Sequence, residues 1–128
     1  MEPPKIGKIW MFASPFSISI LKNSEEWFMD GTFEIVKLTL FSQLYVVVAR
    51  APRSSLKIPC LFALLPDKSK ATYSIMFKKL QELGVPGPKV AHIDYEMAVY
   101  STMKKVFPDT DLVGCDVHWK RNLRDNMR

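Results

Sequence analysis

Short runs of apolar and β-branched residues recur along the chain after residue 26, and they predict β-strands. The expected strands span residues 27–35, 43–51 and 58–65, and, after an interruption, 89–95 and 111–115. Pro52, Ser54 and Ser55 give the segment between the second and third runs the composition of a turn. The first three strands are therefore expected to form an antiparallel meander.

Residues 69–84 have the pattern of an amphipathic helix. Ser69 is placed to cap its N-terminus, Gly84 suits the position after its C-terminus, and Pro86 prevents its continuation. The apolar positions recur at helical spacing: Tyr73, Met76, Phe77, Leu80 and Leu83. We expect this stripe to pack against the sheet.

Helical patterns are also present on either side of the last strand. Residues 96–106 end before Pro108 and direct three apolar residues inward, namely Val99, Met103 and Val106. Residues 118–128 read as an amphipathic helix with Trp119, Leu123 and Met127 on one side. Residues 1–26 contain three prolines and a short helix near residues 18–21, and we treat them as a lead-in segment.

This order of elements favours a mixed α/β sheet of the ribonuclease H-like kind, in which three antiparallel strands precede parallel strands and helices. The domain is expected to occupy residues 27–128. Its sheet is expected to be truncated at the C-terminus, so that the chain is the N-terminal part of the domain. In this topology the first and fourth strands are neighbours.

Two aspartates, Asp30 and Asp94, stand near the ends of those two strands. A carboxylate at the edge of an apolar core loses hydration that only a partner can restore. If the strands are neighbours, both carboxylates can ligate one Mg²⁺ or Mn²⁺ through oxygen. This metal site is an expectation from topology.

Composition narrows the class of protein. The chain has 128 residues, a hydrophobic content of 48%, a formal net charge of +5 and a pI near 9.3. These values fit one domain with a core and favour a polyanionic partner. The two cysteines, Cys60 and Cys115, lie in strand-like contexts, so neither a disulfide framework nor a secreted protein is expected. No apolar run reaches the roughly 20 residues of a membrane span, so no membrane partner is expected.

A set of short motifs, in order along the chain, resembles the Mutator-like element (MULE) transposase domain. The motifs are Trp27-Phe-Met-Asp-Gly-Thr-Phe33, Phe41-Ser-Gln-Leu-Tyr45, Leu64-Leu-Pro-Asp-Lys-Ser69 with Tyr73, Asp94-Tyr-Glu96, Phe107-Pro108 and Gly114-Cys-Asp-Val-His-Trp119. Each motif alone is weak, whereas their order and spacing together are specific. The resemblance begins near Phe12 and continues to the C-terminus.

The resemblance implies a DDE-type recombinase with a ribonuclease H-like fold, in which three acidic residues hold two divalent ions for DNA strand cleavage and transfer. Asp30 matches the first acid and Asp94 the second. Mg²⁺ or Mn²⁺ would help to make water or a 3′-hydroxyl nucleophilic and would stabilise the leaving oxygen. The implied partners are transposon ends and target DNA, and the resemblance also allows an oligomer of the full-length parent protein. The implied location is the nucleus.

The family's third acid is a glutamate beyond the Cys-x-x-His motif, and the sequence ends at Arg128 before reaching it. We therefore expect the chain to be a catalytically incomplete fragment. Glu96, Asp116 and Asp125 are the local acids that could substitute, but Glu96 reads equally as a solvated carboxylate in the first turn of a helix. The alternative function is a transposon-derived, non-catalytic module that binds nucleic acid or protein.

Cys115 and His118 match a signature of the family. They could supply two zinc ligands, but a structural zinc site needs four, and Cys60 and His92 are the other Cys and His residues of the chain. A zinc site is therefore not expected. The favoured role is structural for Cys115, while His118 is expected near the active face, where it orients a neighbour or contacts a phosphate.

The remaining candidates have two readings each. His92 alternates with Asp94 and could share its face of the sheet, or it could be a half-buried, hydrogen-bonded histidine. The basic residues of the last segment could contact the DNA backbone or form a solvated helix face. They are Lys120, Arg121, Arg124 and Arg128.

Overall fold

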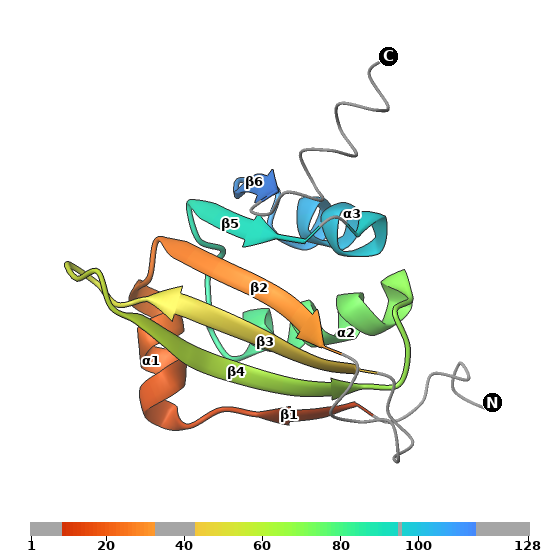
Figure 1. The fold of residues 1–128 in the computed structure, drawn as a ribbon, viewed down its shortest axis with the longest axis horizontal. Coiled ribbons are helices and arrows are strands. Elements are labelled where there is room, and N and C mark those ends of the chain that lie inside the picture. The colour runs from red at the N-terminus through yellow and green to blue at the C-terminus, as the bar shows by residue number, and fades with distance from the viewer. Residues whose placement is uncertain (1–8, 33–42, 95, 115–128) are drawn as a thin grey trace.

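A six-stranded mixed sheet is the framework of the protein, whose computed structural model describes residues 9–32, 43–94 and 96–114. The strands are β1 (Trp10–Phe12), β2 (Glu26–Thr32), β3 (Gln43–Arg50), β4 (Lys57–Leu65), β5 (Val90–Ile93) and β6 (Asp111–Gly114). Their order in the sheet is β1-β4-β3-β2-β5-β6, which Figure 1 shows from bottom to top. The expected strands are thus all present, with ends that differ by a few residues.

Strand direction divides the sheet into two parts. The pairs β1–β4, β4–β3 and β3–β2 are antiparallel, whereas β5 pairs parallel with both β2 and β6. The chain therefore passes from the edge of the meander to the far side of β2 between β4 and β5. The predicted mixed sheet, with β2 and β5 as neighbours, is confirmed.

Three helices connect or precede these strands: α1 (Pro15–Asn23), α2 (Lys70–Glu82) and α3 (Met97–Val106). The hydroxyl of Ser69 accepts a hydrogen bond from the Thr72 backbone amide, as the sequence predicts for the N-cap of α2. Gly84 has a φ of +86°, a conformation that glycine adopts without the steric cost of a Cβ atom. α2 therefore begins and ends at the residues that its capping signals indicate.

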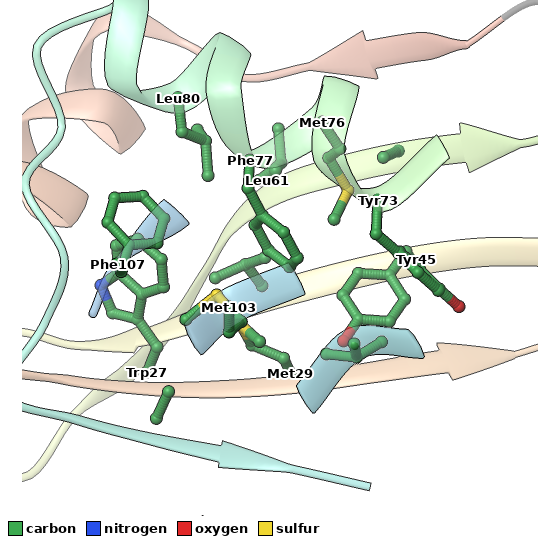
Figure 2. Close-up of a cluster of buried hydrophobic side chains, with 14 of the residues drawn as sticks. Trp27, Met29, Tyr45, Leu61, Tyr73, Met76, Phe77, Leu80, Met103 and Phe107 are labelled. Carbon is green, nitrogen blue, oxygen red and sulfur yellow. The ribbon is translucent and has the colours of Figure 1, made fainter. Parts of the chain in front are cut away.

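One face of the sheet packs on the helices. Alternate strand residues such as Trp27, Met29 and Val47 are at most 1% exposed, and they join Phe77 of α2 and Met103 of α3 in one apolar cluster. Figure 2 shows Trp27, Met29, Phe77 and Met103 of this cluster, with the ring of Phe107 beside Trp27. The two rings meet edge to face with centroids 5.8 Å apart. This core fixes the strands whose ends form the candidate site.

The segment before residue 27 is more structured than the sequence indicated. β1 pairs antiparallel with β4, and Leu21 of α1 is fully buried in the apolar cluster. A strand of three residues gives no readable alternation, which explains why the pattern did not predict β1. α1 had a local signal, because Ser14 caps it and Pro15 occupies its first position.

None of the helices in the described part of the chain is long and apolar enough to cross a membrane.

Candidate functional site

Asp30 and Asp94 lie at neighbouring positions of adjacent parallel strands. The register pairs Phe28 with His92 and Met29 with Ile93, so the next residues along the two strands are the two aspartates. Asp30 is exposed and Asp94 is half-buried. Successive side chains along a strand point to opposite faces of the sheet. Met29 of β2 is buried in the core, so the carboxylate of the next residue, Asp30, points away from the core.

A third carboxylate lies in the same region. Burial raises the pKa of Tyr45 well above its ordinary value, and Tyr73 and the charges of Glu96, Asp94 and Asp30 raise it further. All three acidic side chains therefore act on one buried hydroxyl at this end of the sheet. The site combines negative charge outside with a neutral, protonated phenol inside.

A hydrogen-bonded chain supports the site from within the core. Gln43, at the start of β3, donates from Nε2 to the Tyr73 hydroxyl over 2.8 Å, and that hydroxyl donates to Glu96 Oε1 over 2.7 Å. Burial is the main cause that raises the pKa of Tyr73, so its hydroxyl stays protonated and able to donate. These two hydrogen bonds link β3, α2 and the start of α3 directly behind the strand ends.

Gly31 packs closely against the Gln43 amide. A Cβ atom at position 31 would lie 2.3 Å from Gln43 Oε1 and 3.2 Å from a ring carbon of Tyr45. Gln43 is fully buried, and its Oε1 has no hydrogen-bond partner within the described residues. The glycine after Asp30 therefore serves close packing of the strand on the Gln43 amide.

Asp67 belongs to the helix cap and not to the acidic site. Its carboxylate accepts hydrogen bonds from the Thr72 hydroxyl at 2.6 Å and from the backbone and hydroxyl of Ser69 at 2.9 and 2.8 Å. These bonds, led by that of Thr72, lower the pKa of Asp67. The Leu64–Ser69 motif thus has a structural function, which is to begin α2 and place Tyr73.

Glu96 is not the solvated helix-turn carboxylate that one sequence reading suggested. It is half-buried at the N-cap of α3, makes no side-chain cap bond, and instead accepts from Tyr73. Over residues 9–32, 43–94 and 96–114, no three His, Cys, Asp or Glu side chains are grouped so that they could hold one metal ion. Glu96 therefore contributes charge and order near the aspartates.

His92 is a half-buried, hydrogen-bonded histidine, as the second of its two readings states. Its ring stacks on Phe28 with centroids 4.5 Å apart and an interplanar angle of 5°. Its Nε2 atom lies 2.6 Å from Glu26 Oε2. Glu26 also binds Arg50, so His92 is part of an ion-pair cluster at the opposite end of β2 from Asp30.

This cluster gives a prediction about pH and stability. Hydrogen bonds from Arg50 and, to a smaller extent, from His92 lower the pKa of Glu26 below 4.5. The cluster therefore stabilises the fold above that pH, and this stabilisation is lost as the pH falls through the folded-state pKa of Glu26. We expect Glu26→Gln to lower the free energy of unfolding by about 1 kcal/mol at neutral pH, since the groups are partly exposed. Denaturant unfolding at several pH values measures the effect.

The difference between wild type and Glu26→Gln should shrink toward zero as the pH falls through the lowered folded-state pKa of Glu26. Glu82→Gln is the matched control, because Glu82 is exposed and its ion pair with Lys79 spans 3.8 Å. An effect of Glu26→Gln that is as large at low pH as at neutral pH would contradict this account.

Several predicted site residues fall outside the described residues. They are Cys115, His118, Lys120, Arg121, Arg124 and Arg128, together with the alternative acids Asp116 and Asp125. Their proposed roles stay predictions. Cys60, by contrast, is described, and it is a buried free thiol.

Sequence reasoning missed the function of Gln43. A polar residue at the start of an apolar strand can face either solvent or core, and only the tertiary contact with Tyr73 decides between them. A signal did exist, because Gln43 and Tyr73 both fall within the motifs that resemble the MULE domain.

Comparison with protein families identifies the class of this domain. The family model described as "MULE transposase domain" matches residues 26–122, which span β2 to β6 and both aspartates. The chain therefore belongs to the MULE transposase domain family. No curated protein matches the chain.

Proposed function

We propose that this domain is the N-terminal part of a DDE-type transposase core that acts on DNA, with Asp30 and Asp94 as its first two metal-binding acids. The observation that supports the proposal is the parallel pairing of β2 with β5, which brings the two aspartates to neighbouring strand ends. Membership of the MULE family supports DNA as the substrate class. The site of action would be the nucleus.

The proposed fold is ribonuclease H-like. The support for it is the meander β2-β3-β4, followed by a helix, the parallel strand β5 beside β2, a second helix and the parallel strand β6. In this arrangement the carboxyl ends of β2 and β5 lie at one edge of the sheet, where ligand sites of α/β sheets form.

The side chains fit a divalent cation in donor type. Carboxylate oxygens are the ligands that Mg²⁺ and Mn²⁺ prefer, and the exposed position of Asp30 leaves room for the waters that Mg²⁺ keeps. The described residues supply a neighbouring pair of acids and no group of three. We propose that the third acid of the site lies outside the described residues.

When bound, the metal would supply the activation of a hydroxyl nucleophile and the stabilisation of the leaving oxygen. The contributions of this chain are then positional. Asp30 and Asp94 hold the ion, while the Gln43–Tyr73–Glu96 chain keeps the start of α3, and with it the end of β5, in place. The negative charge of Glu96 strengthens the attraction of the site for cations.

The proposal is tested in the parent protein, read from its transcript through and beyond the codon for Arg128. We expect an open frame with a downstream glutamate, and Mn²⁺-dependent nicking of DNA that falls about 100-fold or more in Asp30→Asn and Asp94→Asn. Asp109→Asn, a change of an exposed acid in the turn before β6, is the control and should keep full activity. Nicking that survives both aspartate changes would refute the assignment.

The second candidate function is a non-catalytic DNA-binding module. It is favoured by the lack of a group of three acids within the described residues. This candidate predicts a stop codon after Arg128 and DNA binding that is unchanged by Mn²⁺ and by either aspartate change.

A further inference from the structure

A pocket of about 760 Å³ lies at the opposite end of β2 from Asp30. It is formed by the end of α1, the starts of β2 and β5, and the end of β3 with the turn that follows. Its lining includes two acids and three cations, together with Ser54; the charged residues are Glu25, Glu26, Arg50, Arg53 and Lys89. Glu26 and Asp30 are four residues apart along the strand, which corresponds to about 13 Å at roughly 3.3 Å per residue.

The pocket has one cation more than its acids neutralise. Arg50 is bound to Glu26, and Lys89 lies 3.4 Å from Glu25. None of the ion pairs among the described residues involves Arg53. The ion pair with Glu26 holds the Arg50 guanidinium at the pocket wall. Arg53 supplies the positive charge of the pocket that no acid among the described residues neutralises.

The backbone at Arg53 has an unusual conformation. Arg53 has a φ of +58°, and no other non-glycine residue in the described part of the chain has a positive φ. The Ser54 amide donates to the Ala51 carbonyl over 3.2 Å, so Pro52 and Arg53 occupy the central positions of a β-turn. A turn with proline first and a positive φ second normally has glycine or asparagine at the second position, because a side chain there is strained. Such strain is held in place by the surrounding structure, and strained residues cluster at functional sites.

We propose that this pocket binds a backbone phosphate of DNA through Arg53, with Arg50 and Lys89 as its flanking cations. The inference rests on the proposed function, in which the domain acts on DNA, and it adds a second point of contact about 13 Å from the aspartates along β2. A duplex repeats phosphates about every 3.4 Å along each strand, so DNA engaged at the aspartates presents further phosphates over that distance. Guanidinium groups match phosphate oxygens in geometry as well as charge.

The test compares the affinity of the wild-type chain and three variants for a labelled DNA duplex of about 20 base pairs. Fluorescence anisotropy is measured in EDTA over a range of NaCl concentrations, so that no metal contributes. The slope of the logarithm of the binding constant against the logarithm of the salt concentration falls by about 0.9 when one phosphate contact is lost. Near 0.1 M salt this corresponds to about eightfold weaker binding. We expect this change for Arg53→Gly.

Glycine suits the positive φ, so the melting temperature of Arg53→Gly should stay close to that of wild type and weaker binding cannot be attributed to unfolding. Arg53→Lys retains the charge and should recover most of the affinity. Lys78→Ala removes one charge from the exposed face of α2, away from the pocket, and should change the affinity less than about twofold. Arg53→Gly with wild-type affinity, an equal loss in Lys78→Ala, or no DNA binding by wild type in EDTA would each overturn the inference.

The double variant Asp30→Asn with Asp94→Asn separates the inference from the proposed function. If the wild type binds no Mn²⁺ but its DNA affinity still depends on Arg53, the metal site fails and the phosphate pocket stands. If Mn²⁺ binds through the aspartates while Arg53→Gly has wild-type affinity, the pocket fails and the metal site stands.

Discussion

Gly31→Ala is expected to lower the free energy of unfolding by about 2–3 kcal/mol, as overpacking of a buried site does. The new Cβ atom would lie 2.3 Å from Gln43 Oε1, and Gln43 is fully buried and hydrogen-bonded to Tyr73. Because Gln43 Nε2 donates to the Tyr73 hydroxyl, moving the amide aside disturbs that hydrogen bond. Gly31 does not have a positive φ, so the cost comes from the contact and not from the backbone. Denaturant unfolding of the purified chain measures it.

A double-mutant cycle makes the prediction specific. In a Gln43→Ala background the amide is absent, and the Cβ atom that Gly31→Ala adds enters the space it leaves. We expect Gly31→Ala to cost less than about 1 kcal/mol there, so the two changes should be strongly non-additive. Equal costs of Gly31→Ala in both backgrounds would show that Gln43 does not pack on Gly31.

The second large effect concerns metal affinity. We expect Asp30→Asn and Asp94→Asn each to weaken Mn²⁺ binding by about tenfold or more, because each change removes a charged oxygen ligand from a site that depends on ligand charge. Titration calorimetry measures the affinity without any catalytic readout. In EDTA the exposed Asp30→Asn variant should be at least as stable as wild type, since it removes repulsion between like charges on adjacent strands.

Asp109→Asn is the matched control for this titration. It makes the same change of net charge at an exposed position in the turn between α3 and β6. An equal loss of Mn²⁺ affinity in the control would mean that the ion responds to overall charge, and the assignment of the two aspartates would then be wrong.

The strands were predictable because each contains enough apolar residues to show its pattern. β3 alternates between buried and half-buried residues from Gln43 to Arg50, and α2 has both a capping serine and a terminal glycine. The neighbourhood of Asp30 and Asp94 was also predictable, but only through topology. Sixty-four residues separate them, and the parallel pairing of β2 and β5 brings them together.

The features that the sequence did not predict depend on tertiary contacts. The polar residue Gln43 sits in the core because the Tyr73 hydroxyl and Gly31 create a place for its amide. Glu96 makes no bond to its own helix and binds the same hydroxyl instead. Arg53 follows a proline in a turn-like segment, yet its positive φ depends on the hairpin geometry that β3 and β4 impose. The partners of Gln43 and Glu96 are distant in sequence, whereas the hairpin around Arg53 is local.

The most direct test of the metal site is the location of Mn²⁺ by anomalous diffraction in crystals of the wild-type chain. A metal site on the two aspartates predicts a Mn²⁺ peak within ligand distance, about 2.0–2.3 Å, of carboxylate oxygens from both Asp30 and Asp94. It also predicts that this peak is lost in crystals of Asp30→Asn. A peak elsewhere on the domain, or density at these strand ends that persists in the variant, would contradict it.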